Sequence, residues 1–244
     1  MPWFLLLFAA PAAFAIDYTL VLDRDGSVTR TNAARAAQRF SPCSTFKIPN
    51  ALIALDLGNA PDADYTMKYD AARDPRTTFW LEEWGGDHDL RSAMRFSVVW
   101  YFKELARRAG AERMSEYLRR FDYGNQDISG GIDRFWLSST LRISPEEQVA
   151  FLRKFQKGRL GVSSKAAVVL KDILILERGD GYVWSGKTGA CGDTAWHVGY
   201  VERNGKPVFY ALNLGGAPFN DLVRERNRLV RELLVDAGLL PRTP

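Results

Sequence analysis

The sequence predicts an α+β fold: an antiparallel sheet built from both ends of the chain, flanked by helices, with a mostly helical lobe inserted between its two parts. Strand patterns lie near the N-terminal end, helix patterns then persist over about 120 residues, and strand patterns return towards the C-terminal end. Pairing the strands of the two ends in one sheet is the simplest arrangement that accounts for all three observations.

Strands are expected where β-branched and aromatic residues lie between turn residues. Asp25-Gly26 and Asn204-Gly205 are typical of tight hairpin turns. The expected strands cover residues 18–23, 27–31, 182–187, 195–203 and 206–214.

Helices are expected where apolar residues recur at helical spacing. The clearest start signal is at Ser144, an N-cap serine that is followed by a proline and, with Glu147, forms a capping box. Gly58 and Gly110 are expected to end the helices that precede them. The expected helices cover residues 51–57, 90–109, 111–121, 144–157, 165–177 and 219–237.

Composition excludes several classes of protein. The chain has 244 residues, of which 46% are hydrophobic and 25% charged, and its formal net charge is +4. These values are usual for a globular protein and exclude a disordered chain, a collagen-like fibre and a coiled coil. The basic residues are spread along the chain without a block that interleaves them with aromatics, so no nucleic-acid partner is expected.

The first 15 residues predict a signal peptide. An uncharged apolar run is followed by small residues that end in Ala13-Phe14-Ala15, the pattern of a cleavage site, although the usual basic residues are missing. A buried N-terminal helix is the alternative. Cleavage would leave residues 16–244 as a single domain, exported to the periplasm and free of the membrane, with a sheet lobe at about 16–48 and 178–244 and a helical lobe at about 49–177.

Ser44-Thr45-Phe46-Lys47 is the first motif that could take part in chemistry. Ser44 and Lys47 share one helix face, and a helix N-terminus favours developing negative charge. A lysine one turn from a serine can take its proton if the amine is neutral, and the apolar neighbours of Lys47 indicate that the amine is buried. Alone, the pattern is more often an N-cap serine and a surface lysine.

Lys187-Thr188-Gly189 is the second motif, at the end of an expected strand. Lys187 and Thr188 on the cleft side would bind a carboxylate, and Gly189 would let a ligand approach the backbone. Residues 181–188 also match the phosphate-loop pattern formally. However, a phosphate loop must open into a helix, whereas a strand follows here, so we interpret that match as accidental.

Ser97-Val98-Val99 and Tyr123-Gly124-Asn125 complete a set of four motifs. In this order, the four motifs resemble those of the class D (oxacillinase-type) serine β-lactamases. The longer segments 40–50 and 123–137 and the segment from Trp196 to Tyr200 are similar to that family too. The resemblance spans nearly the whole chain after the expected signal peptide, and it implies the β-lactamase (penicillin-recognising) fold.

The resemblance also implies an activity, which is hydrolysis of the β-lactam amide of penicillin-type antibiotics through a serine acyl-enzyme, giving antibiotic resistance. It makes Ser44 the nucleophile and Lys47, carbamylated by CO2, the general base for both steps. Ser97 would pass a proton to the leaving nitrogen, and Lys187 would supply positive potential. The small-molecule β-lactam is the only partner implied, and no further cofactor and no metal is expected.

The remaining roles implied by the resemblance concern binding and support. The backbone N–H groups of Ser44 and Ala190 would form the oxyanion hole. Arg226, in preference to Arg224 and Arg228, would bind the substrate carboxylate through its guanidinium fork. The other assignments are substrate binding by Thr188, Gly189 and Val99, support of the carbamate by Trp136 and Val98, and shaping of the site by Tyr123 and Asn125.

Two cysteines flank the motif residues. Cys43 directly precedes Ser44, and Cys191 follows Gly189 by two positions. Both flanks are expected at the site, so we predict a Cys43–Cys191 disulfide, the alternative being two free buried thiols. This placement resembles that in certain class A β-lactamases that hydrolyse carbapenems.

Two other functions stay open: a β-lactam sensor domain that remains acylated, and a D,D-peptidase.

Overall fold

The computed structural model describes residues 16–137 and 140–242, so the predicted signal peptide lies outside the described residues. In the described part, one antiparallel sheet has the strand order β2-β1-β6-β5-β4-β3. Strands from both chain ends pair in it, which confirms the predicted fold class. The strands are β1 (Asp17–Arg24), β2 (Ser27–Arg30), β3 (Ile175–Gly179), β4 (Tyr182–Cys191), β5 (Thr194–Arg203) and β6 (Lys206–Gly215).

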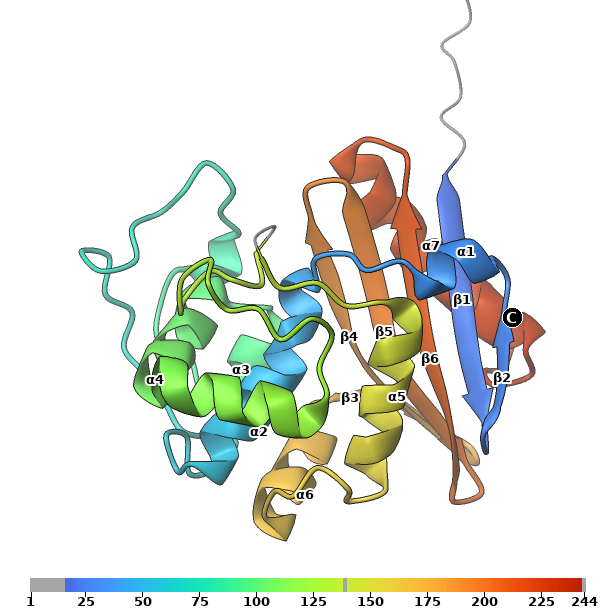
Figure 1. Cartoon of the computed structure of the whole chain (residues 1–244), viewed down its shortest axis with the longest axis horizontal. Helices are drawn as coiled ribbons and strands as arrows, with labels where there is room; N and C mark the ends of the chain where they lie inside the picture. The colour runs from blue at the N-terminus through green and yellow to red at the C-terminus, as the bar shows by residue number, and fades with distance from the viewer. Residues whose placement is uncertain (1–15, 138–139, 243–244) are drawn as a thin grey trace, which may run out of the picture.

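The helices lie on both faces of this sheet (Figure 1). Helix α7 (Phe219–Asp236) covers one face, and α5 (Pro145–Gln156) with the helical lobe covers the other. No helix in the described ranges has the length and hydropathy needed to cross a bilayer. The other helical elements are α1 (Ala33–Ala37), η1 (Cys43–Phe46), α2 (Lys47–Asp56), η2 (Glu82–Trp84), α3 (Leu90–Arg95), α4 (Val99–Phe121) and α6 (Ser164–Ile173).

Several local signals are confirmed. Ser144 and Glu147 form the capping box of α5, with Ser144 Oγ accepting from the Glu147 N–H at 3.2 Å and Glu147 Oε2 accepting from the Ser144 N–H at 2.8 Å. Gly110 has φ 75° and ψ 161° and interrupts α4, so the helix stops where predicted. Asn204 and Gly205 both have positive φ and join β5 to β6, as a tight hairpin requires.

The predicted single helix over 90–109 is wrong. It is divided into α3 and α4, and Ser97 between them has φ 59°. Tertiary contacts stabilise the break, since the indole Nε1 of Trp84 donates to the carbonyl of Phe96 at 3.0 Å. Helical periodicity continues through the break, so the sequence pattern does not reveal it. The break therefore places Ser97 on a turn rather than on a helix face.

The predicted helix over 165–177 is wrong at its C-terminal end. Helix α6 ends at Ile173, and residues 175–179 form β3 at the edge of the sheet, paired with β4. Leu176 is 51% exposed, because an edge strand with little cover leaves one face in water. Pairing with β4 overrides the helical preference of this segment.

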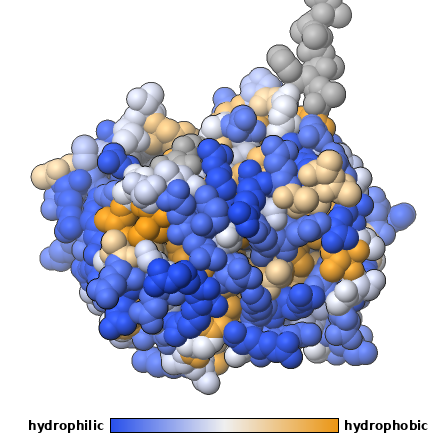
Figure 2. Space-filling view, in the orientation of Figure 1, coloured by the Kyte–Doolittle hydropathy of each residue, from blue (hydrophilic) through white to orange (hydrophobic). Residues whose placement is uncertain are grey.

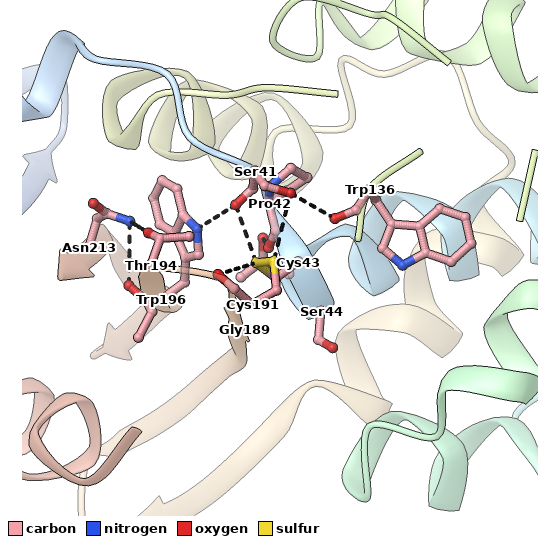
Figure 3. Close-up of a disulfide and its surroundings, with 12 residues drawn as sticks. Ser41, Pro42, Cys43, Ser44, Trp136, Gly189, Cys191, Thr194, Trp196 and Asn213 are labelled. Carbon is pink, nitrogen blue, oxygen red and sulfur yellow. Dashed lines mark hydrogen bonds between the residues drawn. A yellow bond between two sulfur atoms is a disulfide. The ribbon is translucent and has the colours of Figure 1, made fainter. Parts of the chain in front are cut away.

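The predicted disulfide between Cys43 and Cys191 is present, and the Cα atoms of the two residues are 5.7 Å apart (Figure 3). It joins η1 to the end of β4 across a sequence separation of 148 residues. The disulfide therefore connects the turn that precedes α2 covalently to the last residue of β4.

Removal of this disulfide is expected to lower the free energy of unfolding by about 2–5 kcal/mol, because a cross-link that closes a long loop restricts the unfolded chain. The measurement is urea denaturation with and without dithiothreitol. The Cys43→Ala/Cys191→Ala variant is the control, and its unfolding midpoint should be insensitive to the reductant. An unchanged midpoint for the reduced wild-type protein would contradict the prediction.

Candidate active site

The site is built around the turn that contains Ser44. Ser44 lies in η1, a single 3₁₀ turn, and Lys47 is the first residue of α2. The Lys47 Nζ atom is 2.7 Å from Ser44 Oγ and donates to it. The predicted pairing of the two side chains is therefore present, although Ser44 precedes α2 instead of lying on it. Pro49 is tolerated in α2 because it falls in the first turn.

The environment of Lys47 favours a neutral amine. Its side chain is completely buried, and burial is the main cause that lowers the pKa of Lys47 well below its ordinary value. The positive charge of Lys187 lowers this pKa further. An unprotonated amine at hydrogen-bond distance from a hydroxyl can accept that hydroxyl's proton, which gives Ser44 the character of a nucleophile.

Aromatic side chains form the wall around this amine. The Phe46 ring stacks on the Trp136 indole at 5.3 Å between centroids, and Lys47 Nζ lies 5.4 Å from the centroid of the Phe102 ring. Phe102 is a site residue that the motifs do not reveal. Its signal is helical spacing, because it follows Val98 by four positions at the start of α4.

Two buried hydrogen-bond donors of the predicted site residues have no partner among the residues that the structure describes. They are Trp136 Nε1 and Ser97 Oγ. Figure 3 shows the Trp136 indole on the Ser44 side of the disulfide, while its backbone carbonyl accepts from Ser41 Oγ at 3.0 Å. Buried polar groups are normally paired, so each of these donors is available to an oxygen-bearing group. Val98, fully buried at the N-cap of α4, lies between Ser97 and Val99 in the chain.

Strand β4 brings the second motif to the same site. Lys187 is 5% exposed, and its Nζ atom donates to Thr188 O at 3.0 Å and to Thr188 Oγ1 at 3.3 Å. Burial, and secondarily the charge of Arg226, lower the pKa of Lys187 to about 7. The motif lies within a regular strand paired with β5, so residues 181–188 are not a phosphate loop.

Arg226 reaches β4 from α7. Its Nη1 atom donates to Gly189 O at 3.3 Å, and within the described ranges it has no carboxylate partner. Burial lowers the pKa of Arg226 to about 10. By contrast, Arg224 pairs with Asp221, and Arg228 pairs with glutamates of its own helix. Of the three candidate arginines, Arg226 is thus the one available to bind an anion beside β4.

Close packing of the backbone requires a glycine at position 189, a reason that the sequence does not reveal. A Cβ atom at this position would lie 3.0 Å from Pro42 O and 3.0 Å from Thr45 N. The backbone of β4 thus packs directly against the turn that contains Ser44. This contact places Ala190 next to that turn, as two backbone N–H groups that share an oxyanion would require.

The two residues expected to shape the site act from behind it. Tyr123 is fully buried and contacts the Phe46 ring edge-on at 5.8 Å. Asn125 is exposed, and its side chain joins two parts of the following loop by donating to Thr140 O and accepting from the Arg142 N–H. The hydrogen bonds of these two side chains within the described residues go to neither Ser44 nor Lys47.

Both histidines form hydrogen bonds within the protein. His88 bonds to Ser92 and to the carbonyl of Glu83, and His197 bonds to Tyr210. Burial first, then the charges of Arg226 and Lys187, lower the pKa of His197 to about 3. Among residues 16–137 and 140–242, no group of three or more His, Cys, Asp or Glu side chains could hold a metal ion.

Comparison with known proteins agrees with this geometry. Residues 18–234 match the family described as the penicillin binding protein transpeptidase domain. The chain is 41% identical to the β-lactamase OXA-48 of Klebsiella pneumoniae, covering 86% of this chain and 78% of the relative, and 38% identical to OXA-10 of Pseudomonas aeruginosa, covering 83% and 78%. A solved class D β-lactamase from Bacillus subtilis superimposes with a TM-score of 0.85 at 35% identity, covering 93% of this chain and 94% of that one.

The chain belongs to the class D β-lactamases. Its four motifs are therefore those of a serine β-lactam hydrolase, and the resemblance inferred from the sequence is confirmed. In this class D β-lactamase the motifs come from η1, the α3–α4 break, the segment after α4, and β4. The first and the last of these motifs meet because β4 packs on η1 and the disulfide joins the two.

The pKa of Lys187 predicts a pH dependence for the class D β-lactamase. Lys187 is charged below about pH 7 and loses its charge as the pH rises through that value. Since the charged form attracts an anionic substrate, kcat/KM for benzylpenicillin is expected to fall above about pH 7. In Lys187→Arg the charge persists, so its decline should begin at higher pH. A wild-type kcat/KM that stays constant up to pH ~9 would contradict the assignment.

Proposed function

We propose that this class D β-lactamase hydrolyses the β-lactam amide of penicillin-type antibiotics through an acyl-enzyme on Ser44, and thereby confers antibiotic resistance. The observation that supports it best is the buried amine of Lys47 at 2.7 Å from Ser44 Oγ. A serine hydroxyl attacks an amide only when a base takes its proton, and this pair supplies both groups.

We further propose that CO2 carbamylates Lys47. Only an unprotonated amine reacts with CO2, and burial keeps the pKa of Lys47 low. The residues present fit the product, because Trp136 Nε1 and Ser97 Oγ are buried donors without partners that could bond to its oxygens. When present, the carbamate supplies a general base. Val98 and Phe102 keep water from the amine.

The other residues bind the substrate and hold charge. Arg226 and Thr188 bind the substrate carboxylate, Lys187 adds positive potential, and Val99 and Gly189 line the space beside them. Ser44 Oγ attacks the amide carbonyl, while the backbone N–H groups of Ser44 and Ala190 stabilise the oxyanion. The Ser97 hydroxyl gives its proton to the leaving nitrogen as the amide bond breaks, and it takes up in exchange the proton that the base on Lys47 removed from Ser44. Water then hydrolyses the ester and frees Ser44.

An exported location is part of the proposal. The disulfide between Cys43 and Cys191 supports it, because disulfides persist in oxidising compartments such as the periplasm and are rare in the cytosol. The predicted signal peptide would direct the chain there. Its cleavage after Ala15 can be checked by N-terminal sequencing of the protein recovered from the periplasm.

Hydrolysis of nitrocefin with and without bicarbonate tests the activity and the carbamate together. We expect turnover in both conditions, and an increase with bicarbonate after CO2 has been stripped at low pH. Indifference to bicarbonate would contradict the carbamate. A stable acyl-enzyme without turnover, detected by mass spectrometry, would instead indicate a sensor, and cleavage of a D-Ala-D-Ala peptide would indicate a D,D-peptidase.

Trp136→Phe tests which group holds the carbamate. The substitution removes the indole N–H but keeps an aromatic ring against Phe46, so kcat at ambient CO2 is expected to fall about 10-fold to 100-fold, the range that a hydrogen bond to a charged group supplies. High bicarbonate should restore part of the loss. Trp80→Phe is the matched control, because Trp80 Nε1 is also buried and unpaired. Equal effects of the two substitutions would contradict the role of Trp136.

A further inference from the structure

A chain of hydrogen bonds connects α5 to the nucleophile turn from behind the site. Tyr123 Oη donates to Gln148 Oε1 at 3.4 Å, and Gln148 Nε2 donates to Thr45 Oγ1 at 2.8 Å. Thr45 Oγ1 in turn donates to the carbonyl of Pro42 at 2.7 Å. All three side chains are buried, with Gln148 1% exposed and the other two fully covered.

The hydrogen bonds that link Tyr123, Gln148, Thr45 and Pro42 can run in only one direction. The single proton of the Thr45 hydroxyl goes to Pro42 O, because a carbonyl can only accept, so Thr45 Oγ1 is left to accept from the Gln148 amide. The amide oxygen of Gln148 then accepts from Tyr123. Burial raises the pKa of Tyr123, so its phenol keeps the proton that it donates. Each hydroxyl proton is used once and one N–H of the Gln148 amide goes to Thr45, so the hydrogen bonds have a single direction.

The last bond of the chain spans the nucleophile. Pro42 and Thr45 flank Cys43 and Ser44, and the hydroxyl of Thr45 closes the turn between them in addition to the backbone bond from Thr45 N to Pro42 O at 3.1 Å. The backbone of β4 packs against the same two residues at Gly189. Displacement of Thr45 would therefore move Ser44 Oγ relative to Lys47 and the Ser44 N–H relative to Ala190.

We propose that Gln148 is a positioning residue for the β-lactamase reaction: through Thr45 it holds the turn in which Ser44 attacks. This rests on the proposed function of Ser44 as the nucleophile. Gln148 lies more than a hundred residues from the Ser44 motif in sequence and belongs to none of the four motifs. The proposal also gives Tyr123 its role, which is to orient the Gln148 amide.

Gln148→Glu tests the proposal through pH. A buried glutamate has a raised pKa, and its neutral form has one O–H to donate to Thr45 and one carbonyl to accept from Tyr123, as the amide does. The ionised form can only accept, so it loses the bond to Thr45. The titratable groups along this series of hydrogen bonds are Tyr123, which stays neutral, Glu147, which pairs with Arg39, and Lys47, which follows Thr45 by two positions and has a lowered pKa.

One measured quantity is the rate at which a fluorescent penicillin acylates Ser44, with the acyl-enzyme detected by mass spectrometry. The others are kcat and KM for nitrocefin. In Gln148→Glu we expect near wild-type acylation and kcat at acidic pH, a fall of about 10-fold or more as the pH rises through a new ionisation, and little change in KM. Gln148→Met should be slow at every pH. Circular dichroism at the assay temperature verifies that each variant is folded.

Matched variants separate positioning from a general loss of packing. Gln156→Glu makes the same change on the same helix, outside the hydrogen-bond chain, and should keep the wild-type pH profile. Thr45→Ser keeps the hydroxyl and should retain the rate, whereas Thr45→Val should lose it. Loss of rate in Thr45→Ser equal to that in Thr45→Val would assign the effect to packing and overturn the proposal.

Two results would overturn the inference without touching the proposed function. One is a folded Gln148→Glu whose acylation rate follows the wild-type pH profile, and the other is a Thr45→Val as fast as the wild type. Failure of the proposed function appears differently, as a wild-type protein and a Gln156→Glu variant that are acylated and then not hydrolysed. The acylation rate reports the position of Ser44 in either case.

Discussion

The active site depends on keeping one lysine amine dry beside one serine hydroxyl. Burial costs a charged amine so much free energy that the amine gives up its proton instead, and this is why the pKa of Lys47 is low. The aromatic wall of Phe46, Phe102 and Trp136 provides that burial. The fold can thus be described by what it must supply to this pair: a cover against water, and a fixed turn for the serine.

The turn is fixed from both sides of the molecule. On the sheet side, the disulfide, the packing of Gly189 and a hydrogen bond from Trp196 Nε1 to Ser41 O at 2.8 Å tie it to β4 and β5 (Figure 3). On the helical side, Gln148 reaches Thr45 from α5. These constraints lie inside the molecule, because Thr45, Gln148 and Trp196 are buried. The face shown in Figure 2 is mixed in hydropathy.

Sequence reasoning predicted the fold class, the four motifs and the disulfide, because each leaves a local signal: alternating strands, a capping box, short motifs in a fixed order, two cysteines beside them. It failed where tertiary contacts override local preference. The break before Ser97 depends on Trp84, and β3 depends on pairing with β4. Gln148 was missed for a related reason: its position in a helix is predictable, but the partner it reaches is not.

The site also buries basic side chains at a cost in free energy. Lys47, Lys187 and Arg226 are three buried basic groups. In the described part of the chain, none of them forms an ion pair with a carboxylate, and their hydrogen bonds go to hydroxyl, carbonyl and amide oxygens. Lys47 avoids the cost by losing its proton, Lys187 does so in part near neutral pH, and Arg226 keeps its charge. An unpaired buried charge destabilises the folded state. In the proposed function the substrate carboxylate is the partner that this arrangement lacks, so the electrostatic cost that destabilises the free protein favours binding of an anion.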